Sequence, residues 1–122
     1  MVLTKGFKEL VQARATSEPA FAEALLREGI EAMLAGDVDA GKTVLRDYIN
    51  ATVGFEKLGE ATATSPKSLM RMFGSRGNPQ ARNLFGVIGH LQAEAQLKLH
   101  VAVERRGQSA RRARRDSAKT AA

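Results

Sequence analysis

The chain contains no cysteine, so disulfide bonds, thiolate metal sites and cysteine nucleophiles are all excluded. It also lacks any apolar run that approaches the roughly 18 residues needed to cross a bilayer. Its first residues alternate charged and apolar types and do not form the continuous apolar stretch of a signal peptide. These absences favour a cytoplasmic protein that makes no contact with a membrane.

Catalytic and metal-ligating patterns are scarce as well. The acidic residues are scattered, and no set of serine, histidine and aspartate points to hydrolysis. The two histidines, His90 and His100, have no partner at metal-ligand spacing. We therefore expect no enzymatic activity, no metal and no cofactor.

The apolar content of the sequence suits one folded domain. The 122 residues are 43% hydrophobic, an ordinary value for a globular protein. Apolar residues recur at helical spacing between capping residues, prolines and glycines, which predicts an all-α helical bundle. We expect Asp37 or Asp39, Ser65 and Asn78 to cap three of its helices. The expected helices cover about 4–15, 19–35, 38–53, 55–62, 66–73 and 79–95.

The C-terminal part departs from this helical pattern. Residues 97–101 (LKLHV) alternate between apolar and polar types, which predicts one short strand. A single strand leaves its backbone groups unpaired, so it should pair with a second copy or with a partner's sheet edge. The tail 104–122 is rich in arginine, alanine and serine without an apolar anchor, and we expect it to be disordered.

The formal net charge of +6 is distributed unevenly. Residues 1–53 hold six basic and eight acidic residues, whereas residues 54–82 hold five basic and two acidic ones. The tail holds seven basic and two acidic residues. This asymmetry suggests an anionic partner for the middle and the end of the chain. We divide the chain into an N-terminal helical region (1–53), a middle region (54–103) and the tail (104–122).

Residues 36–43 (GDVDAGKT) match the phosphate-binding pattern G-x-x-x-x-G-K-[ST]. A phosphate-binding loop needs a preceding strand, but residues 31–35 continue a helical pattern. Asp37 and Asp39 would also repel phosphate groups from inside the loop. We interpret the segment as a connection between two helices with an aspartate cap.

Residues 55–73 have the spacing of a DNA-binding helix-turn-helix. Gly59 supplies the small residue that a close crossing of the two helices requires, and Ala63 fills the turn. The residues expected on the inner, apolar side are Leu58, Ala61, Leu69 and Phe73. An ordinary helical hairpin with a solvated charged face is the alternative interpretation of the same spacing.

Ten residues are predicted to contact DNA. Lys67 and Arg71 can reach guanine or phosphate, and Ser68 can bond to a base or to the backbone. Met70 can touch a thymine methyl group. Polar groups before and after the second helix are expected to position the DNA backbone. The full set is Ser65, Pro66, Lys67, Ser68, Met70, Arg71, Ser75, Arg76, Asn78 and Arg82.

The stretch 58–101 resembles the addiction-module antidote proteins, which are helix-turn-helix antitoxins akin to HigA. The resemblance is carried by TSPKSL at 64–69, GNP at 77–79, NLFGVI at 83–88 and LKL at 97–99. It implies a homodimer that binds a palindromic operator, represses its own operon and neutralises a small toxin of the RelE or ParE type.

The resemblance also assigns residue roles. By position, Lys67, Ser68 and Arg71 would read bases. The chain departs from the family pattern in its long helical front and arginine-rich tail. It departs again at Gly59 and Ala63, where the commoner motif has alanine and then glycine.

Two functions from different classes follow from the sequence. The first is a transcriptional repressor whose acidic helical front mediates dimerisation or holds a basic toxin. The alternative is a helical adaptor for protein interactions, with a basic tail that binds nucleic acid nonspecifically.

Overall fold

Residues 5–107 are described by a computed structural model, and they form six α-helices. No strand is assigned within these residues, so the all-α prediction is confirmed for this part of the chain. None of its helices is long and apolar enough to cross a membrane. The helices are α1 (Lys5–Ser17), α2 (Pro19–Leu34), α3 (Val38–Ala51), α4 (Phe55–Thr62), α5 (Pro66–Met72) and α6 (Ala81–Ala95).

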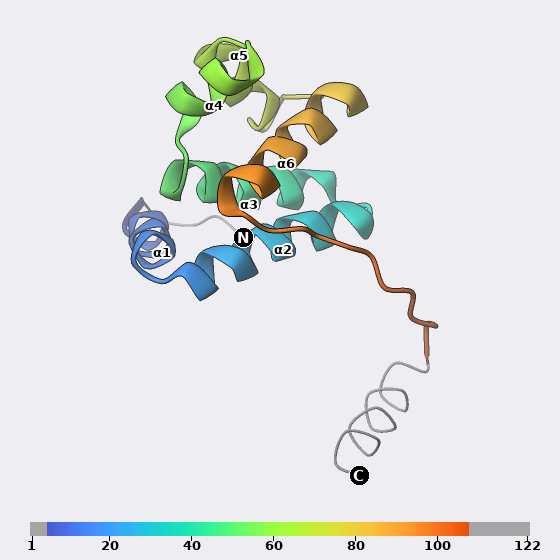
Figure 1. The fold of residues 1–122 in the computed structure, drawn as a ribbon. Helices are drawn as coiled ribbons and strands as arrows, with labels where there is room; N and C mark the ends of the chain where they lie inside the picture. The colour runs from blue at the N-terminus through green and yellow to red at the C-terminus, as the bar shows by residue number, and fades with distance from the viewer. Residues whose placement is uncertain (1–4, 108–122) are drawn as a thin grey trace.

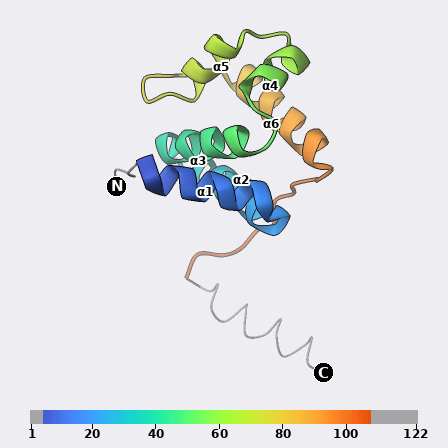
Figure 2. The ribbon, with the colours of Figure 1, turned by 90° about the vertical axis from the view of Figure 1, so that its left-hand side faces the viewer.

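Helix α3 lies between two groups of helices (Figure 1). Helices α1 and α2 pack against each other and against α3 on one side. On the other side, α4 packs against α5 and α6, as the turned view also shows (Figure 2). One apolar cluster connects both groups. Its most deeply buried side chains are Leu26, Leu45, Ile49, Leu58, Leu69, Phe73 and Leu91.

Capping residues begin two of these helices where the sequence predicts. The Asp37 carboxylate accepts a hydrogen bond from the Ala40 amide at 3.2 Å and caps α3. The Ser65 hydroxyl accepts one from the Ser68 amide at 3.1 Å and caps α5. Each bond satisfies a backbone donor that a helix start leaves without an intrahelical partner.

The prediction that Asn78 caps the last helix is wrong. Helix α6 begins at Ala81, with Gln80 at its N-cap and no side-chain cap bond. The reason is tertiary, because the chain after α5 first folds back on that helix. The Gly77 amide donates to the Gly74 carbonyl at 3.0 Å, and a side chain at Gly77 would overlap the Arg71 carbonyl. This loop extends the connection past Asn78.

The predicted C-terminal strand is not confirmed. Residues 97–105 have no assigned regular structure and run as a coil away from α6 (Figure 1). The alternation is nevertheless present, because Leu97 and Leu99 pack against the core while Lys98 and His100 are exposed. Residues 104–107 are exposed; the rest of the tail, and Thr4 at the start, lie outside the described residues.

Candidate functional site

Helices α4 and α5 cross closely at Gly59. A β-carbon at this position would lie 2.6 Å from the Thr64 carbonyl oxygen and 3.3 Å from Pro66 Cδ. Only a residue without a side chain fits there, which confirms the packing role predicted for Gly59. Ala63 ends α4 in the left-handed conformation, at φ 54° and ψ 39°. The turn between the two helices is therefore only residues 63–65 long.

The inner side of this pair is close to the predicted one. Leu58, Leu69 and Phe73 are all at most 2% exposed. Ala61 is exposed, so its predicted place in the core is wrong. The buried face of α4 is centred on Phe55, Leu58 and Gly59, and Ala61 lies two positions beyond Gly59, which turns it away from this face.

The outer side of α5 carries the positive charge. Lys67, Ser68, Met70 and Arg71 are exposed, and Met70 leaves 49% of its surface accessible. Within the described residues, the side chains of Lys67 and Arg71 form neither an ion pair nor a hydrogen bond. Their charges are therefore available to an anionic ligand. The other predicted contact residues are also at the surface: Ser65, Ser75, Arg76, Asn78 and Arg82 are exposed, and Pro66 is half-buried.

The two serines at the start of α5 are coupled. The Ser65 hydroxyl donates to the Ser68 hydroxyl at 2.8 Å, in addition to accepting from the Ser68 amide. This arrangement leaves the Ser68 hydroxyl hydrogen free to donate to a ligand. The cap of the helix and a predicted base-contacting group are thus held in one small network.

Lys42 of α3 holds the loop that follows α5. Its ammonium group donates to the Gly77 carbonyl at 2.6 Å and to the Gly74 carbonyl at 3.1 Å, and lies 3.4 Å from Asp39 Oδ1. The residue is only 3% exposed. The loop carries Ser75 and Arg76, so a lysine more than 30 positions away positions two of the predicted contact residues.

Sequence reasoning missed this role. It noticed Lys42 only as one letter of the phosphate-binding pattern, and nothing in the local sequence identifies two backbone carbonyls so far along the chain as its partners. The rejection of that pattern is confirmed. Helix α2 precedes the segment where the pattern needs a strand, and the Lys42 ammonium group is already occupied by protein oxygens.

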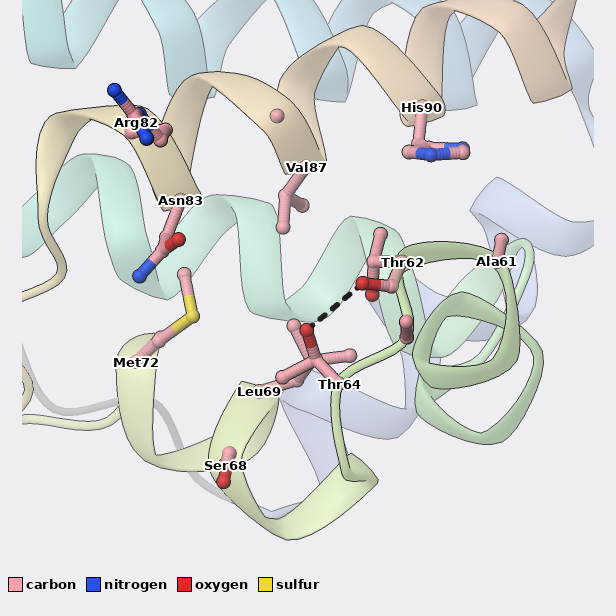
Figure 3. A pocket seen from close by; sticks show the side chains of 12 residues that line it. Ala61, Thr62, Thr64, Ser68, Leu69, Met72, Arg82, Asn83, Val87 and His90 are labelled. Atoms are coloured by element: carbon pink, nitrogen blue, oxygen red, sulfur yellow. Dashed lines mark hydrogen bonds between the residues drawn. The ribbon is translucent and has the colours of Figure 1, made fainter.

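A groove of about 480 Å³ lies between α5, α6 and the turn that precedes α5 (Figure 3). Arg82 and Asn83 of α6 lie toward one end of it and His90 toward the other. The Thr64 hydroxyl donates to the Thr62 carbonyl at 3.2 Å within the turn that borders the groove. Ser68 and Arg82 are the two lining residues that the sequence assigns to DNA contact, and no local sequence pattern indicates the groove.

A second hollow, of about 460 Å³, has the opposite electrostatic character. It lies where α1 meets α2, against the ends of α3 and α6, and Glu23 and Glu94 line it. Burial raises the pKa of the Tyr48 hydroxyl here, the Glu94 and Glu23 carboxylates raise it further, and a hydrogen bond with Thr52 opposes them. Residues 5–107 hold no group of three or more histidines, aspartates and glutamates that is placed to bind a metal.

Comparisons with models of protein families, with curated proteins and with solved structures found no match to this chain.

Proposed function

We propose that α4 and α5 form a helix-turn-helix and that the protein binds double-stranded DNA in a sequence-specific manner, with α5 in the major groove. The observation that carries the proposal is the division of α5 into two faces. Leu69 is 1% exposed and locks the helix on the core, while Lys67, Ser68 and Arg71 point outward with unpaired charges or an unused donor. Side chains of these types read base edges and phosphates.

The placement of charge supports the same proposal. Arg76 in the loop after α5 and Arg82 at the start of α6 add exposed cations beside the outer face of α5. The helices on the far side of α3 carry exposed acids, among them Glu23, Glu28 and Glu31 of α2. A molecule polarised in this way presents its basic end to a polyanion and keeps its acidic end away from it.

We propose further that the protein is a transcriptional repressor and the antitoxin of a toxin–antitoxin module. In this role it binds a palindromic operator as a cytoplasmic homodimer and represses its own operon without enzymatic activity. The support is the resemblance of residues 58–101 to the HigA-like antitoxins. The exposed glutamates of α2 offer complementary charges to a small basic toxin, since opposite charges steer such partners together.

The test is binding of the purified protein to the duplex upstream of its own reading frame, compared with a scrambled duplex across a series of salt concentrations. We expect a preference of roughly several hundredfold that survives physiological salt. Arg71→Ala should weaken operator binding by about 1–3 kcal/mol. Arg27→Ala removes the same charge from an exposed site on α2 and should leave binding unchanged.

The same titration separates the adaptor function from the repressor function. A variant that ends at Gly107 loses five basic residues and one acidic residue. A repressor keeps its preference for the operator in this variant and loses mainly nonspecific affinity. If the shortened variant loses nearly all DNA binding, and the full chain shows no preference for the operator, the result would contradict the repressor function and support the adaptor function.

A further inference from the structure

The groove between α5 and α6 has a lining that carries positive charge only. Among the described residues that line it there is one permanent cation, Arg82, one histidine, His90, and no aspartate or glutamate. The second hollow is the reverse, since Glu23 and Glu94 line it and no described cation does. The charge of the groove therefore favours an anionic ligand over a cationic one.

The polar side chains of the groove also have unused hydrogen-bonding capacity. Within residues 5–107, the side chains of Arg82, Asn83 and His90 make neither a hydrogen bond nor an ion pair. The Ser68 hydroxyl accepts from Ser65 and keeps its own hydrogen for a ligand. A ligand that binds these groups breaks no bond that the fold already uses.

The centre of the groove is apolar. Leu69 of α5 and Val87 of α6 lie between its two polar ends, and Met72 borders the end that carries Asn83 (Figure 3). Small-molecule sites combine an apolar lining of this kind with a few polar groups that fix the orientation of the ligand. The volume of about 480 Å³ lies within the range of such sites.

Gly86 keeps the middle of the groove open. It lines the groove on α6, and a β-carbon at this position would meet no atom within 4 Å. Arg82 lies about one turn before it and His90 about one turn after it, so the open stretch follows about 12 Å of helix. This length suits a body of two fused rings that carries one acidic headgroup.

We propose that the groove binds a small organic anion, in which a carboxylate or a phosphate ester is attached to a flat apolar body. The Arg82 guanidinium pairs with the acidic headgroup, because charge-assisted bonds from arginine to carboxylate or phosphate are the strongest available there. The apolar body lies over Gly86 and against Leu69 and Val87. The His90 imidazole borders the far end of the ligand.

Occupancy of the groove has a consequence for DNA, and this part of the inference rests on the proposed function. Ser68 and Arg82 line the groove and also belong to the proposed DNA contacts. An anion that binds their donors adds negative charge beside the outer face of α5, and it competes there with the phosphates of the duplex. The ligand therefore releases the protein from DNA.

The test follows the backbone amide NMR signals of the isotope-labelled full chain, without DNA, during titration with naphthoate or naphthyl phosphate. We expect saturable shifts centred on Gly86, with a Kd of about 1 mM or tighter for a ligand of this size in an open site. The two anions distinguish a carboxylate from a phosphate ester as the preferred headgroup. Naphthylmethylamine and inorganic phosphate should bind at least about tenfold more weakly, since one reverses the charge and the other lacks the apolar body. Equal binding of either control would overturn the proposal.

Two pairs of variants locate the ligand. Gly86→Leu should abolish the saturable shifts, because a leucine side chain in a helix lies over the preceding turn, which here carries Arg82. Gly6→Leu makes the same change at an exposed position of α1, where a β-carbon also meets no atom within 4 Å, and should leave binding unchanged. Arg82→Gln should weaken naphthyl phosphate binding about tenfold, whereas Arg27→Gln should not. Unchanged affinity in Gly86→Leu would overturn the site.

Competition with the upstream duplex separates this inference from the proposed function. At about ten times its own Kd, naphthyl phosphate should raise the Kd for the duplex about tenfold, and it should have no such effect on Gly86→Leu. Anion binding in a protein that binds no duplex would contradict the proposed function and leave the groove site standing. Specific duplex binding without anion binding would overturn the groove site alone. Duplex affinity that saturating naphthyl phosphate leaves unchanged would overturn the release from DNA.

Discussion

The chain contains two helical hairpins, α2–α3 and α4–α5. Their backbones are similar, but their positively charged side chains differ in exposure. Each turns through a residue with positive φ, Gly36 at 90° and Ala63 at 54°. Each crosses at a glycine: a β-carbon would lie 2.9 Å from Leu45 Cδ2 at Gly29 and 2.6 Å from the Thr64 carbonyl at Gly59. The hairpins are therefore close equivalents as backbone structures.

The positively charged side chains of the two hairpins differ in whether they are exposed. Lys42 of α3 belongs to a segment with the letters of a phosphate-binding loop, yet it is 3% exposed and bound to two carbonyls of the protein itself. Lys67 and Arg71 of α5 belong to no such pattern, yet they are exposed and unpaired within the described residues. A sequence motif gives the position of a charged residue along the chain, whereas packing decides whether that charge is exposed to a ligand.

The largest effect should come from removing the buried cation. Lys42→Met leaves the Gly74 and Gly77 carbonyls without their donor, and we expect a loss of about 2–3 kcal/mol in the free energy of unfolding. Urea denaturation measures it. Lys57→Met makes the same chemical change at an exposed site of α4 and should alter stability by less than about 0.5 kcal/mol. Equal losses of unfolding free energy at the two positions would show that the buried Lys42 stabilises the fold no more than an exposed lysine does.

The next effect concerns the crossing of the second hairpin. Gly59→Ala gains about 1 kcal/mol of helix propensity but forces the α4 and α5 backbones apart, for a net loss of about 1–2 kcal/mol. Gly89→Ala on α6 is the control, because its β-carbon would meet nothing within 4 Å. That variant should gain about 0.5–1 kcal/mol. Thermal unfolding of both proteins checks the opposite signs.

A smaller effect compares the two helix caps. Asp37→Ala and Ser65→Ala each remove one side-chain acceptor from a helix start and should each lower stability by about 1 kcal/mol. Only Ser65→Ala should also weaken binding to the upstream duplex, since Ser65 lies at the proposed interface and Asp37 at the other hairpin. A matching loss of DNA affinity in Asp37→Ala would mean that the two hairpins do not differ in function.

The smallest effect is confined to high pH. Because burial raises the pKa of Tyr48 in the folded protein, the unfolded chain releases this proton first as the pH rises through about 10. The stability that Tyr48 contributes is therefore complete below pH 10 and declines above it. Tyr48 is the only tyrosine and the chain has no tryptophan, so ultraviolet titration reports this group alone. Tyr48→Phe should lose that part of the decline; an unchanged pH profile would contradict the assignment.

Local chemistry explains why most helices are predictable from the sequence. Ser65 with Pro66, and Asp37 after Gly36, set helix starts through contacts that reach no more than three or four residues along the chain. The outward face of α5 follows equally simply, because Leu69 at the centre of a short helix defines the opposite side. The exposure of Lys67, Ser68, Met70 and Arg71 required no knowledge of the rest of the molecule.

Apart from Ala61, the predictions that the structure does not bear out involve contacts between distant segments. The N-cap of α6 is Gln80 and not the predicted Asn78, because the preceding loop packs back on α5 and is tied to α3. The alternation at 97–101 has the period of a strand, but this chain offers the segment a core surface on one side and no neighbouring strand within the described residues. A strand is defined by its partner, and periodicity alone does not supply one.

The sequence by itself therefore determined the helical class, most helix limits and the face of α5 that carries free charge, since these depend on caps, turns and apolar spacing within a few residues. Only the tertiary structure decided that Lys42 serves the protein and not a ligand, that a groove opens between α5 and α6, and that the apolar face after α6 remains half covered. The partners of Lys42 lie more than 30 residues along the chain, and the other two features also depend on how separate helices pack, which a linear pattern does not encode.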